Sequence, residues 1–234
     1  MITEPPAIRY ADLETLSREL ARQLAAKLKA AIEQRGRASL VVSGGRSPVK
    51  LFERLRGADV EWNRVSVTLA DERWVDPKDP SSNERLVRDE LLQERAADAR
   101  FTGLKNAEPT PDAGAAAAWS AIAGMARPFD AVLLGMGDDG HTASLFPDSP
   151  NLAAALDASA APGCVAMASP TPPRARLSLN LASLLESRHI VILITGESKW
   201  LTYSAASRSG PAERMPVRAV LRQRRTPVEV FWSP

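Results

Sequence analysis

Residues 189–195 read His-Ile-Val-Ile-Leu-Ile-Thr, so the stretch from Ile190 to Ile194 is entirely aliphatic. A strand with one face in water alternates apolar and polar residues, whereas an unbroken apolar run is typical of a strand buried on both faces. Residues 198–206, which follow directly, are predicted to form a helix. Helices that cover both faces of buried strands define an α/β fold with a mostly parallel sheet. This stretch therefore predicts that fold class.

Short apolar strands alternate with helices over the rest of the chain as well. Leucine and isoleucine recur at three- and four-residue steps between Leu13 and Ile32, which predicts an amphipathic helix with Asp12 as its N-cap and Gly36 as its C-terminal cap. Further strands are predicted at 39–43, 65–69, 131–134, 165–168 and 228–232, and further helices at 48–55, 82–92, 113–125 and 177–185. Because no change of composition marks a linker, we expect one domain over residues 1–234.

The composition excludes several classes of protein. A formal net charge of +2 is small for a nucleic-acid-binding protein. The single cysteine, Cys164, cannot form an internal disulfide, and two histidines cannot build a multi-histidine metal site. Residues 1–10 lack the basic region and apolar run of a signal peptide, and no apolar stretch approaches the length of a membrane span. We therefore expect a cytoplasmic protein with no metal, no membrane segment and no nucleic-acid partner.

Segments that follow predicted strands are candidate ligand-binding sites, because parallel sheets bind ligands at the carboxyl ends of their strands. The first reads Ser43-Gly-Gly-Arg-Ser-Pro48 and lies between a predicted strand and a predicted helix. Ser47 suits the N-cap of that helix, and Pro48 suits its first position. Gly44 and Gly45 let backbone N–H groups approach a ligand closely, and a helix start attracts anions such as phosphate. A plain strand-to-helix turn is the alternative interpretation.

The second segment, Asp71-Glu-Arg73, places three charged residues in a row after the strand predicted at 65–69. Buried charges need partners or a ligand. Arg73 is suited to hold a phosphate or to stabilise a developing oxyanion. The alternative is a cluster of surface ion pairs. Ser82 and Asn83, a few residues later, are predicted to lie at a helix N-terminus, with one or the other as its N-cap.

The third segment, residues 135–147, reads Gly-Met-Gly-Asp-Asp-Gly-His-Thr-Ala-Ser-Leu-Phe-Pro. It begins with the spacing Gly-x-Gly-x-x-Gly, but Asp138 and Asp139 would crowd a pyrophosphate, and no acid ends the next strand. We therefore reject a dinucleotide site. Imidazoles titrate near neutral pH and suit water activation, so His141 is interpreted as a general base whose tautomer Asp139 fixes. Ser144 completes no nucleophile triad, because the Gly-x-Ser-x-Gly turn is absent.

Two further cations follow predicted strands or precede predicted helices. Arg176 lies in Pro172-Pro-Arg-Ala-Arg-Leu-Ser178, and Lys199 follows the aliphatic strand by one tight turn. From that position Lys199 could reach the same crevice and hold a phosphate. Taken singly, a cation in such a position is more often a solvated surface charge.

Together these segments resemble the bacterial type of 6-phosphogluconolactonase, a family related to glucosamine-6-phosphate deaminases. The matching stretches, which occur in family order across nearly the whole chain, are 43–48, Asp71-Glu-Arg73, Ser82-Asn83, 134–147, Arg176-Leu-Ser and Gly196-Glu-Ser-Lys199. The stretch 134–147 is the most specific of them. The chain departs from the family at Arg46-Ser47, where a single residue followed by threonine is common, but serine keeps the hydroxyl.

The resemblance implies a Rossmann-like three-layer fold, no cofactor, and hydrolysis of 6-phospho-D-glucono-1,5-lactone to 6-phosphogluconate in the oxidative pentose phosphate pathway. It implies that His141 takes a proton from the attacking water beside Asp139, and that Arg73 lies near the reacting end. Phosphate-binding positions of the family fall on Gly44, Gly45, Arg176 and Lys199; we add Ser43 and Asp71 to the predicted substrate-binding residues. We expect a monomer whose partner is this small-molecule lactone.

Two other functions remain open at this point. An amino-sugar-phosphate isomerase or deaminase would use Asp71 as its base, but the acid that follows the histidine in that family is missing before Asp148. A non-catalytic sugar-phosphate sensor would share the crevice. The complete set of His141, Asp139 and Arg73 argues against that alternative.

Overall fold

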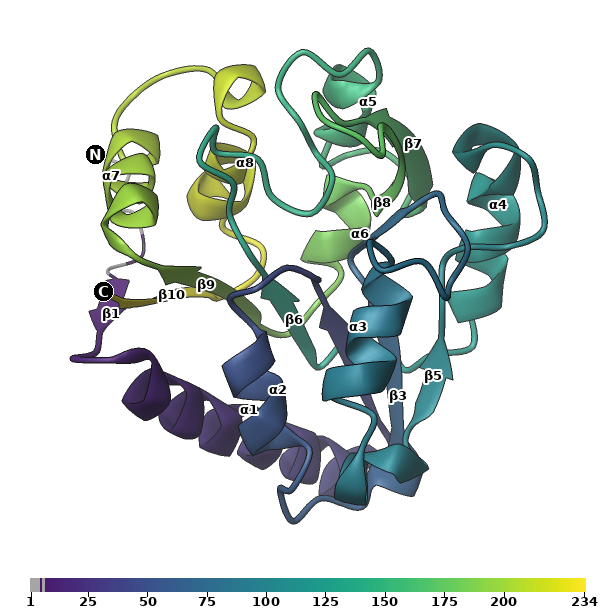
Figure 1. Cartoon of the computed structure of the whole chain (residues 1–234), viewed down its shortest axis with the longest axis vertical. Helices are drawn as coiled ribbons and strands as arrows, with labels where there is room; N and C mark the ends of the chain where they lie inside the picture. The colour runs from purple at the N-terminus through teal and green to yellow at the C-terminus, as the bar shows by residue number, and fades with distance from the viewer. Residues whose placement is uncertain (1–4, 6) are drawn as a thin grey trace.

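A seven-stranded sheet runs through the computed structural model, which describes Pro5 and residues 7–234 (Figure 1). Part of the stretch searched for a signal peptide, residues 1–4 and 6, lies outside the described residues. The strands follow the order β1 (Ala7–Arg9), β10 (Val228–Ser233), β9 (Ile190–Thr195), β6 (Ala131–Leu134), β2 (Ala38–Val42), β3 (Val65–Leu69) and β5 (Arg100–Thr102). Every pair of neighbours is parallel, so the predicted α/β class and parallel sheet are confirmed.

Helices flank this sheet on both sides. They are α1 (Leu13–Arg35), α2 (Val49–Leu55), α3 (Asn83–Glu90), α4 (Pro111–Ile122), α5 (Leu152–Ala155), α6 (Leu181–Leu185), α7 (Glu197–Ala206) and α8 (Val217–Arg222), with short 3₁₀ turns at Trp62–Arg64, Glu94–Asp98 and Ala212–Arg214. In Figure 1, α1 and α2 lie below the sheet, and α6, α7 and α8 lie above it. This is the expected three-layer arrangement.

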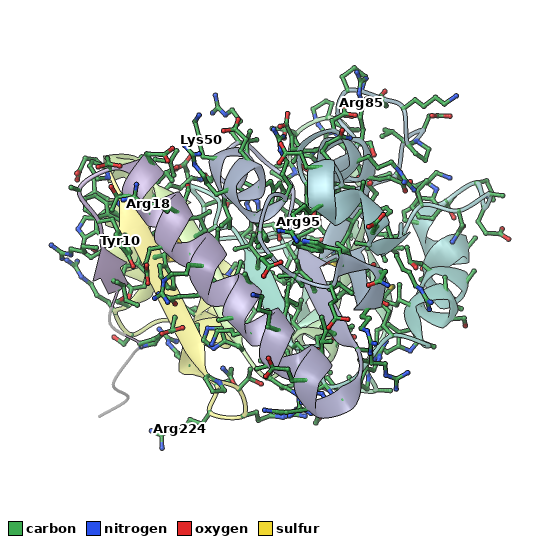
Figure 2. The ribbon with its side chains drawn as sticks, turned by 90° about the horizontal axis from the view of Figure 1, so that it is seen from below. Tyr10, Arg18, Lys50, Arg85, Arg95 and Arg224 are labelled. Atoms are coloured by element: carbon green, nitrogen blue, oxygen red, sulfur yellow. The ribbon has the colours of Figure 1, made fainter. Side chains whose placement is uncertain are left out.

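The longest helix, α1, forms for the reasons that its sequence indicates. The Asp12 carboxylate accepts the Thr15 N–H at 2.7 Å, and Gly36 ends the helix in a left-handed conformation with φ of 73°. Four of its leucines, Leu16, Leu20, Leu24 and Leu28, are buried in the core, while Arg18 is exposed. Figure 2, a view from below, shows α1 crossing the sheet obliquely. Both predicted caps are confirmed.

A second, three-stranded sheet corrects two predictions. Its order is β4 (Asp71–Arg73), β8 (Ala175–Leu179) and β7 (Cys164–Ala168), and both pairs are antiparallel. The helix predicted at 177–185 is therefore wrong in its first half, and Asn180 caps the short α6 instead by accepting the Ser183 N–H. The predicted strand end at Asp71 is a strand of its own. Pairing between residues about a hundred positions apart decides both cases, and no local pattern contains it.

The segment before α2 corrects a third prediction. Pro48, not Ser47, occupies the N-cap of α2, and it makes no side-chain capping bond. The Ser47 hydroxyl lies instead 3.0 Å from the Thr195 hydroxyl at the end of β9. This contact links the loop after β2 to the aliphatic strand. The strands β1 and β5 were not predicted, because three residues at a sheet edge are too short to show periodicity.

Asp130 ties the start of β6 to its surroundings. Its side chain is 3% exposed and lies 2.5 Å from the Arg35 guanidinium. It also accepts the Ser39 backbone N–H of β2 at 2.9 Å. Losing the carboxylate would leave a buried N–H donor without its acceptor.

We therefore expect Asp130→Ala to lower the free energy of unfolding by about 1–3 kcal/mol, the usual cost of an unsatisfied buried polar group. Urea denaturation followed by tryptophan fluorescence measures the change. Asp59→Ala is the control, because the Asp59 carboxylate is 74% exposed and forms only surface ion pairs. Equal destabilisation by the two variants would show that the buried carboxylate has no special structural role.

Candidate active site

A cleft of about 350 Å³ opens where the ends of β2, β6 and β9 meet the small sheet. Such volumes are typical of small-molecule sites. Its lining includes every residue predicted for catalysis or substrate binding except Asp139, namely Ser43, Gly44, Gly45, Asp71, Arg73, His141, Arg176 and Lys199. The fold thus brings into one cavity residues that lie up to 156 positions apart in the chain, from Ser43 to Lys199.

His141 is held by the predicted partner, which lies directly behind it. The Nδ1 atom of His141 is 2.6 Å from Oδ1 of Asp139, and the same oxygen accepts the His141 backbone N–H at 3.0 Å. Burial alone would raise the pKa of Asp139, but the hydrogen bond and charge of His141 lower it overall. An ionised carboxylate at Nδ1 favours the tautomer with its proton there, which leaves a lone pair on Nε2.

The glycines around His141 allow its close packing against Asp139. A Cβ atom on Gly137 would lie 2.0 Å from Nδ1 of His141 and 2.5 Å from Oδ1 of Asp139. The Gly137 N–H donates to the His141 carbonyl at 2.8 Å, and Gly140 closes the turn with a φ of 80°. The glycines therefore allow a tight turn that presents the imidazole. The needs of this turn account for the Gly-x-Gly-x-x-Gly spacing, which is also found in dinucleotide sites.

Phe146 lies between the imidazole and a cation of the small sheet, a position that sequence reasoning missed. Its ring centroid is 4.3 Å from that of His141, and the Arg176 guanidinium carbon lies 5.8 Å from the Phe146 centroid. The side chain is buried. The only available signal was a large aromatic residue in a polar, glycine-rich segment.

Two arginines face each other on the small sheet. Arg73 of β4 and Arg176 of β8 are directly opposite in the antiparallel ladder. Burial, together with the Arg73 charge, lowers the pKa of Arg176, while Asp71 and Glu72 oppose the shift. The Nε atoms of both arginines are buried and have no hydrogen-bond partner in the described part of the chain. Like charges opposite each other destabilise a sheet, so this arrangement favours an anion in the cleft.

Glu72 anchors the strand that carries Arg73. This fully buried carboxylate accepts the backbone N–H groups of Arg73, Asn83 and Glu84, each at 2.7 Å, and the Ser82 hydroxyl at 3.0 Å. Burial raises the pKa of Glu72, and these hydrogen bonds oppose the rise. Glu72 therefore joins β4 to the start of α3, where the predicted N-cap Ser82 is confirmed.

Asn83 also lines the cleft, although the sequence assigned it only a capping role and a place in a stretch that matches the family. Its amide donates to the Asp71 carbonyl at 2.8 Å, while its Oδ1 atom is buried without a hydrogen-bond partner among the described residues. A Cβ atom on Gly44 would lie 1.9 Å from that oxygen, so only glycine fits there. The Asp71 carboxylate, buried beside it, accepts the Ser144 hydroxyl at 2.5 Å.

Further groups of the cleft are suited to a phosphate. Gly45 has a φ of 98°, and the Ser43 hydroxyl is buried without a hydrogen-bond partner within the described residues. α7 begins at Gly196 with no side-chain cap, so its first N–H groups are not satisfied by a side chain. Lys199, in its first turn, lies 3.3 Å from Asp138.

The described part of the chain was also searched for metal-binding clusters and for helices that could span a membrane. In Pro5 and residues 7–234, no group of three or more histidine, cysteine, aspartate or glutamate side chains is placed to hold a metal ion. Within the same residues, no helix is both long and apolar enough to cross a membrane.

Comparison with known proteins places the chain in a family. A family model described as glucosamine-6-phosphate isomerases/6-phosphogluconolactonase matches residues 11–232. A 6-phosphogluconolactonase from Rhizobium meliloti (strain 1021) is 42% identical over 94% of each chain, and one from Pseudomonas putida is 42% identical over 98% of this chain and 95% of its own. The crystal structure of a 6-phosphogluconolactonase from Shewanella baltica OS155 superposes with a TM-score of 0.96 at 47% identity, covering all of both chains.

The resemblance inferred from the motifs is therefore confirmed over nearly the whole sequence rather than over isolated segments. The chain belongs to the glucosamine-6-phosphate isomerase/6-phosphogluconolactonase family and is similar to its 6-phosphogluconolactonase members.

Proposed function

We propose that this protein is an ester hydrolase that converts 6-phospho-D-glucono-1,5-lactone to 6-phosphogluconate in the oxidative pentose phosphate pathway. The observation that carries the proposal is the imidazole of His141, backed by Asp139 and facing a cleft lined by Arg73, Arg176 and Lys199. The names of the relatives support the same reaction. A cleft with one base and several cations suits a substrate with a phosphate and a carbonyl that becomes an oxyanion.

Water activation falls to His141. Its Nε2 lone pair accepts a proton from water as the oxygen attacks the lactone carbonyl carbon C1. Asp139 stabilises the imidazolium that forms, because its carboxylate lies 2.6 Å from Nδ1. The imidazolium then donates the same proton to the departing ring oxygen. The carboxylic acid left at C1 loses its remaining proton to solvent and becomes the carboxylate, and no step of this sequence needs a cofactor.

Arg73 is assigned to the developing oxyanion. Its guanidinium is fixed by the Ser81 carbonyl, while its Nε–H has no partner in the described structure. A preorganised donor of this kind stabilises charge that appears only in the transition state. Backbone N–H groups of the cleft can share the task.

The phosphate is assigned to Gly44, Gly45, Arg176 and Lys199, with the Ser43 hydroxyl as a further donor. Binding at this remote group orients the lactone ring against His141 and supplies energy for the chemical step. Asp71 is assigned to a sugar hydroxyl. Its Oδ2 is taken by Ser144, but its Oδ1 has only a 3.5 Å contact with the Asn83 amide and can accept another hydrogen bond.

The chain is assigned to a single domain, because one parallel sheet joins β1 near its start to β10 near its end, and it is proposed to act as a monomer. The substrate is a small polar metabolite, and the lone cysteine needs no oxidising environment, which supports a cytoplasmic location.

The direct test measures lactone hydrolysis above the spontaneous background, with 6-phosphogluconolactone and with gluconolactone lacking the phosphate. We expect strong acceleration only for the phosphorylated lactone. Equal rates with and without protein would refute the proposed reaction.

His141→Ala should lower kcat by about 10²- to 10⁴-fold, the usual contribution of general acid–base catalysis. Stopped-flow measurements with the phosphorylated lactone give kcat, and circular dichroism verifies the fold. Near wild-type turnover would remove His141 from the mechanism.

Gly137→Ala should reduce kcat strongly without unfolding the protein, because the added methyl group would collide with His141 and Asp139. A loss of about tenfold or more is expected, since small displacements of a catalytic group are costly. Gly124→Ala is the matched control, because a Cβ there meets nothing within 4 Å. Equal activity of the two variants would contradict the packing argument.

Lys199→Ala should raise KM by about 10- to 100-fold and change kcat less, because a charge-assisted hydrogen bond to the phosphate is lost. Lys50→Ala serves as the control: Lys50 is exposed, pairs with Glu53 and does not line the cleft. An effect confined to kcat would mean that Lys199 acts on the reacting end and not on the phosphate.

A further inference from the structure

Asp138 is the charged residue of the loop before His141 that the proposed chemistry leaves unused. Its Oδ1 atom lies 3.3 Å from Nζ of Lys199 and accepts the Ser198 hydroxyl at 3.0 Å. Its backbone carbonyl accepts the Thr202 hydroxyl at 3.2 Å. Three residues of α7 thus hold one residue of the loop, and one of the three is the lysine assigned to the phosphate.

The ion pair with Asp138 offsets the positive charge of this lysine. Among the described residues, Asp138 is the one acid that forms an ion pair with Lys199. The hydrogen bond from Ser198 is the main reason that the pKa of Asp138 is lowered, so the carboxylate is ionised at neutral pH. The Lys199 side chain is 24% exposed and that of Asp138 is 68% exposed. Pairs with such solvent access are weak, and a phosphate can therefore displace the carboxylate.

We propose that Asp138 tunes ligand affinity by competing with the phosphate group for the ammonium of Lys199. A phosphate monoester carries about −1.5 to −2 charges at neutral pH, against −1 for the carboxylate. The phosphate therefore displaces the carboxylate, but its observed affinity is lower than it would be without this competitor. The inference rests on the proposed function only in taking Lys199 as a phosphate ligand.

Competition of this kind has a clear use in the proposed reaction. Hydrolysis of the lactone creates a carboxylate, so the product carries more negative charge than the substrate. A cleft lined by Arg73, Arg176 and Lys199 would retain this product. Binding that stabilises substrate, transition state and product equally does not raise kcat. Return of Lys199 to Asp138 offsets the attraction and favours product release.

The test uses Asp138→Asn in the full-length protein. Without the competing carboxylate, the dissociation constants of inorganic phosphate and 6-phosphogluconate should fall by about two- to fivefold, the range expected for an exposed ion pair. Titration calorimetry measures both constants without turnover. A variant that merely disturbs the loop would bind more weakly, so tighter binding distinguishes competition from a structural role.

Glu197→Gln is the matched control, because it removes an exposed carboxylate from the first turn of the same helix. It should tighten binding less than Asp138→Asn does. In a Lys199→Ala background, Asp138→Asn should have no more effect than Glu197→Gln. Weaker phosphate binding by Asp138→Asn, equal effects of the two single variants, or persistence of the effect without Lys199 would each overturn the inference.

The lactonase assay separates this inference from the proposed function. A wild-type protein that binds phosphate but hydrolyses no lactone would refute the function and leave the competition measurable. A protein that hydrolyses the lactone normally, but whose Asp138→Asn variant binds phosphate more weakly, would refute the inference alone.

Discussion

Parallel pairing of β6 with β2 on one side and with β9 on the other is the constraint on which the site depends. The strands are buried on both faces, so their register is set by the core and not by the loops. Because parallel strands end at the same edge, the Gly44–Gly45 turn, the His141 loop and the start of α7 meet there. The glycine-rich connections can then serve chemistry, since the sheet supplies the stability.

The small antiparallel sheet adds what the parallel sheet cannot provide. It places Arg73 and Arg176 side by side on the wall of the cleft, an arrangement that costs stability without an anion. Glu72 offsets that cost locally, because its buried carboxylate binds backbone N–H groups of β4 and α3. Glu72 thereby fixes the backbone of β4, and the buried Nε–H groups of both arginines have no hydrogen-bond partner among the described residues.

Each carboxylate in or beside the cleft has a hydrogen-bond or ion-pair partner, and these pairings determine which charges a ligand encounters. Asp139 is bound to His141, Asp71 to Ser144 and Glu72 to backbone N–H groups, while Asp138 shares the ammonium of Lys199. The acids therefore orient other groups more than they repel anions. Asp138 is the most exposed of these acids, at 68% against 41% for Asp139, which makes its ion pair the most open to exchange.

The sequence by itself determined the fold class, the long helix with both caps, and the residues gathered in the cleft, because strand burial, capping and glycine-rich turns are local signals. It could not determine that Asp71–Arg73 and 175–179 form a second sheet, that the Ser47 hydroxyl contacts Thr195, or that Asn83 and Phe146 line the site. These features were decided by tertiary structure, since each depends on hydrogen bonds or packing between segments far apart in the chain. Short-range sequence patterns contain no information about such contacts. The residues involved form no distinctive pattern in the sequence, and only the fold brings them together.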